Sequence, residues 1–339
     1  MKFKKIFCAA LTMGVLLSSI PVSAKVEESV IMDNNANMTA DAKLESMDGY
    51  MGVLSKMDFE LTIPQAAQND VMTIDAETGD NYEPNNGPDK ATNNQKGSAV
   101  SANIHDETDV DWYKFEVTSE DVENQTLYSF VLTDIPQTCD YDMYLANANF
   151  QATADLKEGP ASEQMVCSFN QAGTYYVVIQ SASGYNASYN YKLYFGPSWK
   201  NGSTGWRTTG LTFHFPNRDA GVGSDYLSAN EGWQIYDGFR TDSSIPVNSM
   251  VERFYLDADG TGTNTWGGFH KRILAASEPN VYYEQFGGID IFNLQAGKYP
   301  VKQQWGITGV INYANYFVWK PNVCVDYKFP VIIDNMRFI

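Results

Sequence analysis

The sequence predicts an all-β protein in which two β-sandwich-like domains follow a signal peptide and a mobile acidic leader. From residue 80 onward, short runs rich in Val, Ile, Tyr, Phe and Thr recur, separated by clusters of Gly, Asn, Asp and Pro. Alternation such as Tyr175-x-Val177-x-Ile179 gives a strand one buried face. A turn-rich segment at residues 196–203 then divides the β region in two.

The first 24 residues have the pattern of a secretory signal peptide. Lysines at positions 2, 4 and 5 precede an apolar run over residues 6–17, and small residues at 22–24 supply a cleavage site. No later apolar run reaches the length of a membrane span. We therefore expect a secreted, extracellular protein without membrane insertion. Residues 25–79 are rich in Asp, Asn, Glu and Met but poor in aromatic residues, which predicts a disordered acidic leader.

The formal net charge of the chain is −18. Nucleic acids and anionic lipids attract surfaces rich in Lys and Arg, so this charge argues against both as partners. It favours bound cations instead. The sequence gives no indication of the oligomeric state.

Residues 80–196 predict the first domain, a sandwich of about seven strands. Its clearest strands are Trp112–Val117, Leu127–Leu132, Met143–Ala146, Gln164–Phe169, Thr174–Gln180 and Tyr189–Phe195. Residues 197–339 predict a second β-rich domain of ordinary size, whose family the sequence does not identify. Its clearest strands are Gly210–Phe215, Val251–Leu256, Val281–Phe286, Gly309–Ile311, Asn315–Trp319 and Tyr327–Ile333.

Three cysteines follow the signal peptide: Cys139, Cys167 and Cys324. Because export permits disulfides, a bridge between Cys139 and Cys167 is one interpretation. Buried thiols, which behave as small hydrophobic groups, are the other, and we slightly favour them. The spacing of Cys and His does not match a zinc site.

Two clusters of oxygen donors flank a short polar connection, and the second cluster runs directly into a strand. Carboxylates and amides packed this densely repel one another unless water or a cation separates them. Calcium, which takes six to eight oxygen ligands at flexible geometry, suits such a set. A solvated acidic turn is the alternative. The candidate metal ligands are Asn81, Glu83, Asn85, Asn86, Asp106, Asp109 and Asp111.

The same stretch opens a series of motifs that resembles a known family. The motifs are Glu-Pro-Asn-Asn at 83–86, Asp-x-Asp-Trp-Tyr-x-Phe at 109–115, Tyr-Asp-x-x-Leu at 141–145, Gly-Thr-Tyr-Tyr-Val at 173–177 and Tyr-x-Leu at 191–193. In this order they resemble the bacterial pre-peptidase C-terminal (PPC) domain, and they are similar to the collagen-binding domains of clostridial collagenases. The resemblance covers residues 80–196 and implies a small β-sandwich of the kind appended to secreted proteases.

The resemblance also implies a calcium-ordered linker. In the related collagen-binding domains, the linker before the first strand supplies ligands together with acids just ahead of that strand. This match places Asn81, Glu83, Asn85 and Asn86 on the linker side and Asp109 and Asp111 on the strand side, with Asp106 as a substitute. Asn81 and Asn86 occupy places usually held by acids, which implies weaker binding or a partly hydrated ion.

Motifs of common enzyme classes are missing from the sequence. It has no Gly-x-Ser-x-Gly elbow, no His-Glu-x-x-His and no nucleotide-binding glycine fingerprint. Each of His105, His214 and His270 is more typical of a structural or surface role than of a catalytic base. A catalytic triad assembled only in space stays open. The sequence therefore leans towards a protein without catalytic activity and does not decide the question.

Six of the seven tryptophans lie in residues 197–339. Aromatic rings on loops can stack on sugars or peptides. Trp233 and Trp266 stand in Gly- and Asn-rich contexts, so we predict these two as ligand-binding residues. Packing inside a sandwich core is the alternative, and it is the stronger interpretation for a single tryptophan other than Trp266.

Together these patterns predict a secreted, non-catalytic adhesion protein that engages an extracellular polymer, either protein or polysaccharide. The alternative is an extracellular hydrolase, a peptidase or glycosidase, with its active site in residues 198–339. A pocket with convergent acids or a Ser–His pair would favour the hydrolase. A flat face with exposed aromatic residues would favour binding.

Overall fold

A computed structural model describes residues 79–215, 229–230, 232–257, 269–286, 288–311 and 317–339. In this part of the chain nearly all regular structure is β, which confirms the predicted fold class. The described helices are the short α2 (Ser119–Glu123) and the 3₁₀ helix η2 (Ile333–Phe338). Neither has the length and apolar character that crossing a membrane requires. The predicted signal peptide, nearly all of the leader, and Trp266 lie outside the described residues.

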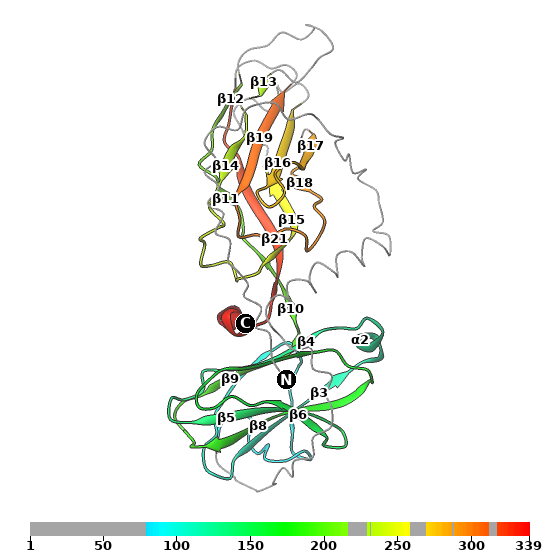
Figure 1. Ribbon diagram of the computed structural model, residues 1–339, viewed down its shortest axis with the longest axis vertical. Helices are drawn as coiled ribbons and strands as arrows, with labels where there is room; N and C mark the ends of the chain where they lie inside the picture. Colours follow the sequence, from blue (N-terminus) through cyan, green and yellow to red (C-terminus); the bar gives the residue numbers. More distant parts are fainter. Residues whose placement is uncertain (1–78, 216–228, 231, 258–268, 287, 312–316) are drawn as a thin grey trace, which may run out of the picture. The chain divides into compact units, whose positions relative to one another are not determined.

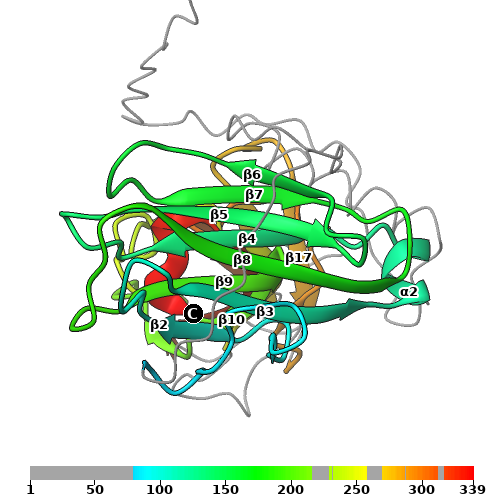
Figure 2. The same ribbon diagram turned by 90° about the horizontal axis from the view of Figure 1, so that it is seen from below.

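The first nine strands form two sheets (Figure 1). They are β1 (Thr92–Asn93), β2 (Ala99–Ala102), β3 (Val110–Val117), β4 (Tyr128–Thr133), β5 (Asp140–Asn147), β6 (Ala152–Asp155), β7 (Glu163–Cys167), β8 (Gly173–Ser183) and β9 (Tyr191–Pro197). One sheet has the order β1-β3-β8-β5-β6 and the other β2-β9-β4-β7. In Figure 2 the two sheets overlap as layers whose strands run in roughly the same direction.

The core of this sandwich follows from the alternation in its strands. Tyr113 and Phe115 of β3 and Val177 and Ile179 of β8 point into one buried apolar cluster, which side chains of β4 and β9 complete from the opposite sheet. Aromatic rings dominate this cluster, and Phe115 lies 5.4 Å from Phe195 between ring centroids. The buried face predicted from Val177 and Ile179 is therefore the interior of the sandwich.

The remaining strands form three further sheets. They are β10 (Trp199–Ser203), β11 (Arg207–Thr208), β12 (Phe213–Phe215), β13 (Ala229–Asn230), β14 (Gln234–Tyr236), β15 (Met250–Leu256), β16 (His270–Ala275), β17 (Tyr282–Phe286), β18 (Ile291–Phe292), β19 (Trp305–Ile311), β20 (Phe317–Trp319) and β21 (Asn322–Pro330). One sheet has the order β10-β21-β15-β18, with β11 on β21. Another has the order β13-β19-β16-β17, with β14 on β19, and β12 pairs with β20.

These sheets enclose a second apolar cluster, which contains Trp305 and Trp319 fully buried. For these two tryptophans the core interpretation is correct. The strand predicted at Tyr327–Ile333 is partly wrong, because β21 ends at Pro330 and η2 begins at Ile333. Cys139, Cys167 and Cys324 are buried free thiols, as the slightly favoured interpretation had it.

Candidate metal centre and aromatic face

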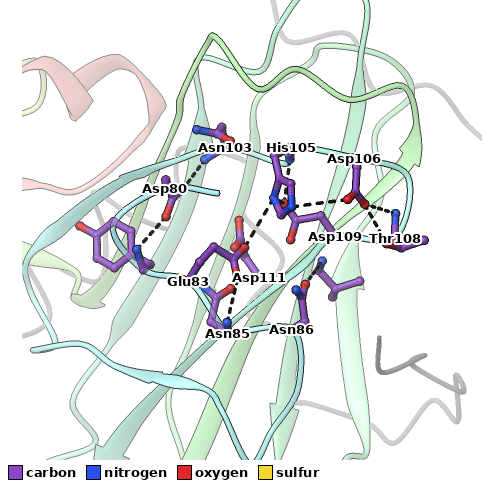
Figure 3. A network of polar contacts seen from close by, with 12 residues as sticks. Asp80, Glu83, Asn85, Asn86, Asn103, His105, Asp106, Thr108, Asp109 and Asp111 are labelled. Carbon is purple, nitrogen blue, oxygen red and sulfur yellow. Dashed lines mark hydrogen bonds and ion pairs between the residues drawn. The ribbon is translucent and has the colours of Figure 1, made fainter. Parts of the chain in front are cut away.

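The linker at residues 79–87 is fixed against the start of β3, so the two predicted clusters of oxygen donors meet. The backbone N–H of Val110 donates to Asn86 Oδ1 at 2.7 Å. The backbone N–H of Trp112 donates to the carbonyl oxygen of Asn85 at 3.0 Å. Figure 3 shows the side chains of Glu83, Asn85, Asp109 and Asp111 gathered between the linker and β3.

Each carboxylate of this group has one oxygen held by a donor. Glu83 Oε2 accepts from the backbone N–H of Asn85 at 2.9 Å, and Asp109 Oδ2 accepts from the backbone N–H of His105 at 2.7 Å. Asp111 Oδ2 accepts from the hydroxyl of Tyr191. These bonds fix the orientation of all three carboxylates.

The second oxygen of each carboxylate is buried and has no hydrogen-bond partner among the described residues: Glu83 Oε1, Asp109 Oδ1 and Asp111 Oδ1. The side chain of Asn85 lies beside Asp111, and its Oδ1 also lacks a partner. Buried polar atoms nearly always have hydrogen-bond partners, so four such oxygens in one place mark a site that water or a cation would complete.

The electrostatics of the group support this conclusion. Burial raises the pKa of Glu83 to about 7, and the nearby negative charge of Asp109 adds to the effect. Burial also raises the pKa of Asp109, and it raises that of Asp111 well above its usual range. Without a cation, the fold therefore resists having all three carboxylates ionised at once.

His105 and Gly79 lie at the same site; the sequence predicted only a structural or surface role for His105 and no role for Gly79. His105 Nδ1 lies 2.6 Å from Asp109 Oδ2 and 3.7 Å from Glu83 Oε1. Ligand atoms of Glu83, His105 and Asp109 all lie within 4.8 Å of one another. A Cβ at Gly79 would come within 2.5 Å of Glu83 Cγ, so only glycine lets the chain pass this close.

Two predicted ligands stand apart from this buried group. Asn81 is exposed on the linker. The Asp106 side chain is 44% exposed and accepts from the backbone N–H and the hydroxyl of Thr108, which lowers its pKa. Asp80, which the prediction left out, accepts from the backbone N–H groups of Tyr82 and Asn103 and so fixes the start of the linker. The polar and acidic pattern that led to the prediction of Asn81 also includes Asp80. The same pattern would therefore have identified Asp80.

The donor set fits a hard cation. Three carboxylates and one amide offer oxygen ligands, which Ca²⁺ prefers, and water or backbone oxygens would complete its shell. The imidazole of His105 is a ligand that transition metals use more often than calcium does. In the present geometry His105 Nδ1 faces Asp109, so the histidine orients a carboxylate as an outer-shell group would.

The predicted ligand-binding residue Trp233 lies on the outward face of the second domain. Its side chain is 37% exposed, and it precedes β14. A Cβ at Gly306 of β19 would lie 3.2 Å from Trp233 Cε3, so the missing side chain leaves room for the indole. The indole and the ring of Tyr282 on β17 lie 6.2 Å apart between centroids.

The sheet register extends this surface across β14, β19, β16 and β17 (Figure 1). Ile235 pairs with Gly306, Gly306 with Leu274, and Leu274 with Tyr282. Phe286 lies four residues after Tyr282 and therefore on the same face of β17; it is 57% exposed. We call Trp233, Ile235, Leu274, Tyr282 and Phe286 the aromatic face.

A charged pair lies within the aromatic face. The Arg272 guanidinium is 4.9 Å from the ring centroid of Tyr282 and forms an ion pair with Glu284. Burial would raise the pKa of Glu284, but its contacts with His270 and Arg272 hold it below its usual value. Glu284 is therefore an acceptor fixed in its ionised form.

Two open hollows lie elsewhere on the described surface. One, beside β5 and β8, includes Phe169 and Tyr175. The other, in the second domain, is lined by Asn201, Gly202, Glu252, Arg253, Asp326 and Tyr327. In this second hollow burial raises the pKa of Glu252, whose Oε1 has no hydrogen-bond partner in the described part of the chain.

Comparison with known proteins does not assign a family. No family model matches the chain, and no curated protein is similar to it. The solved structure of the PBSX exported protein XepA is 9% identical and covers 80% of this chain and 99% of its own, with a TM-score of 0.23. A protein from Parabacteroides distasonis is 9% identical over 69% of this chain and 85% of its own, with a TM-score of 0.18. Such low scores indicate neither a family nor an activity.

Proposed function

We propose that the protein is a secreted, non-catalytic binding protein that attaches to an extracellular polymer through the aromatic face. The exposed Trp233 on an open sheet carries this proposal. Among the described residues, an exposed sheet face that carries aromatic rings suits binding to a chain that lies across it. The rings offer apolar area, and Arg272 and Glu284 offer polar groups between them.

The polymer that this face favours is a polysaccharide. Sugar rings stack on aromatic side chains and present hydroxyl groups, which the guanidinium of Arg272 and the carboxylate of Glu284 can bond. The net charge of −18 disfavours strongly anionic polymers. An insoluble protein remains the other outcome of the test.

The test is co-sedimentation of the purified protein with insoluble polysaccharides and, in separate tubes, with insoluble collagen. Trp233→Ala should weaken binding by about 2 kcal/mol if the indole is a hot spot. Trp206→Ala is the matched control, because Trp206 is also exposed but packs against Tyr255 on another sheet. Equal losses in the two variants would contradict a site on the aromatic face.

Our proposal for the first domain is a PPC-like sandwich whose linker a calcium ion orders. The four unpaired buried oxygens support this part, because a divalent cation would offset most of the negative charge of Glu83, Asp109 and Asp111. Glu83 and Asn85 belong to the linker and both aspartates to the segment entering β3. The residues present would thus hold the ion between two segments and fix one to the other.

A hydrolase with its active site in the second domain is the other candidate. The hollow at Glu252 and Asp326 supports it, because a carboxyl with a raised pKa can donate a proton to a leaving group. Asp326 accepts from the Tyr255 hydroxyl at 2.7 Å. The test is hydrolysis of a peptide or glycoside by the purified protein. If Glu252→Gln abolishes this activity and Trp233→Ala leaves it unchanged, the result favours a hydrolase over a binding protein.

A further inference from the structure

Lys271 occupies an interior position of β16. Phe269, Ile273 and Ala275 are buried on the same side of the strand, as the alternation requires. The Lys271 side chain, at 0% exposed, takes the place of an apolar residue among them. An ammonium is rarely buried to this degree unless the chain supplies a partner.

The partners of Lys271 come from two separate segments. Its Nζ lies 2.5 Å from Asp290 Oδ1 and donates to the carbonyl oxygen of Leu256 at 3.0 Å. The backbone N–H of Leu256 in turn donates to the carbonyl oxygen of Asp290 at 2.9 Å. One residue at the end of β15 thus fixes both the amine and the backbone of the carboxylate that faces it.

We propose that Lys271 and Asp290 become joined by an intramolecular amide bond between Nζ and Cγ. An amine and a carboxyl group that share a hydrogen bond in a fixed geometry already have the proximity that amide formation requires. Removing two partly desolvated charges in favour of one neutral amide also relieves the cost of burying the ammonium.

The reaction balances within the pair. A proton passes along the hydrogen bond from the ammonium to Asp290, which gives a neutral amine and a carboxylic acid. The Nζ lone pair then attacks Cγ, the C–OH bond breaks, and the hydroxyl leaves with a proton from nitrogen as one water molecule. Asp290 is partly exposed, so the water has a path to solvent. No oxidant, reductant or cofactor takes part.

The environment favours the neutral amine that the attack requires. Burial lowers the pKa of Lys271, although Asp290 and the more distant Asp257 oppose the shift. The two carboxylate oxygens of Asp257 are occupied by the backbone N–H and side-chain amide of Asn322. The Asp257 carboxylate is therefore held by another segment, which leaves Asp290 as the carboxyl that faces the amine.

The bond is tested by mass spectrometry of the full-length secreted protein. The intact mass should be lower than the mass of the mature sequence by one water molecule. A proteolytic digest should contain a branched peptide in which Lys271 is linked to Asp290. Detection of this branched peptide supports the bond. Its absence, or a water loss located at another aspartate, overturns the proposal.

Variants separate the bond from an ordinary ion pair. Lys271→Arg keeps a positive charge but cannot form this amide, so it should have the full mass and no branched peptide. Lys298→Arg is the matched control, because Lys298 also pairs with a carboxylate, Glu278, but is exposed. This control should retain the branched peptide. If Lys271→Arg does not fold, the digest of the unaltered protein still decides the question.

Discussion

The three carboxylates beside β3 and the Lys271–Asp290 pair on β16 both place charge in the interior. The first group brings together charges of the same sign, and the second brings together charges of opposite sign. Beside β3, the buried oxygens of Glu83, Asp109 and Asp111 meet no Lys or Arg among the described residues near them. On β16, the chain supplies an ammonium and a carboxylate to each other. We therefore propose that the first group takes a cation from solution, whereas the second pairs opposite charges within the chain.

The largest effect is expected where the chain supplies both partners. Asp290→Ala removes the carboxyl group that Lys271 meets, as an ion pair or as the proposed amide, and leaves the ammonium of Lys271 buried without it, which costs up to about 3–5 kcal/mol. Urea unfolding should show the same loss in calcium and in chelator, because this pair and the proposed calcium ligands belong to different sheets. If calcium reduced the loss of stability in Asp290→Ala, the carboxylates beside β3 and the pair on β16 would not be independent.

The next effect concerns the cation itself. A ligand that binds only the folded state at a hundredfold excess over its Kd adds about 2.7 kcal/mol of stability. Asp111→Asn should abolish this calcium increment while keeping an oxygen for the Tyr191 hydroxyl. In chelator the variant should be more stable than the parent protein, because a costly buried carboxylate is gone. Asp334→Asn, an exposed change on η2, should keep the full increment.

A change of pH should sharpen the same comparison. The pKa of Glu83 rises from 4.5 to about 7 on folding, so in chelator its contribution to stability is complete below pH 4.5 and is lost as pH rises through 7. The proposed calcium ion would bind the ionised form of Glu83 and should cancel this loss. The calcium increment in melting temperature should therefore grow between pH 5 and about pH 8. An increment independent of pH would contradict the assignment of these carboxylates as ligands.

The smallest effect is expected at Asn81. The sequence predicts this residue as a calcium ligand, but its side chain is exposed and outside the buried group. Asn81→Ala should change stability by no more than about 0.5 kcal/mol, with or without calcium. Asn85→Ala provides the contrast, because Asn85 Oδ1 is buried beside Asp111 and its loss should weaken calcium binding. Equal responses in these two variants would argue against the geometry of the site.

Much of the fold could be predicted because apolar alternation is a local signal. The strands β3, β4, β8 and β15 agree with their predicted positions to within three residues at either end. The strand β16 was missed because His270, Lys271 and Arg272 hide the alternation that places Ile273 and Ala275 inside. Burial of a lysine depends on partners from distant segments, which no local pattern shows.

The candidate sites divide in the same way. Residue type and motif order were enough to predict Glu83, Asp109 and Asp111, although Glu83 stands in a separate cluster from the two aspartates. His105 and Gly79 could not be assigned, because their roles depend on which side chain they approach in space. For the aromatic face, context marked Trp233, but Ile235 and Leu274 join it only through the pairing of their strands with β19.

The most direct test of this account is the thermal unfolding of the unaltered protein in excess calcium and in excess chelator, at neutral pH and equal ionic strength. The account predicts a higher melting temperature in calcium, and a difference that increases with the logarithm of calcium concentration once the site is saturated. Magnesium at the same concentrations should have a smaller effect, because it demands a stricter octahedral geometry. Identical melting temperatures in calcium and chelator would contradict the proposal that the unpaired oxygens beside β3 hold a cation.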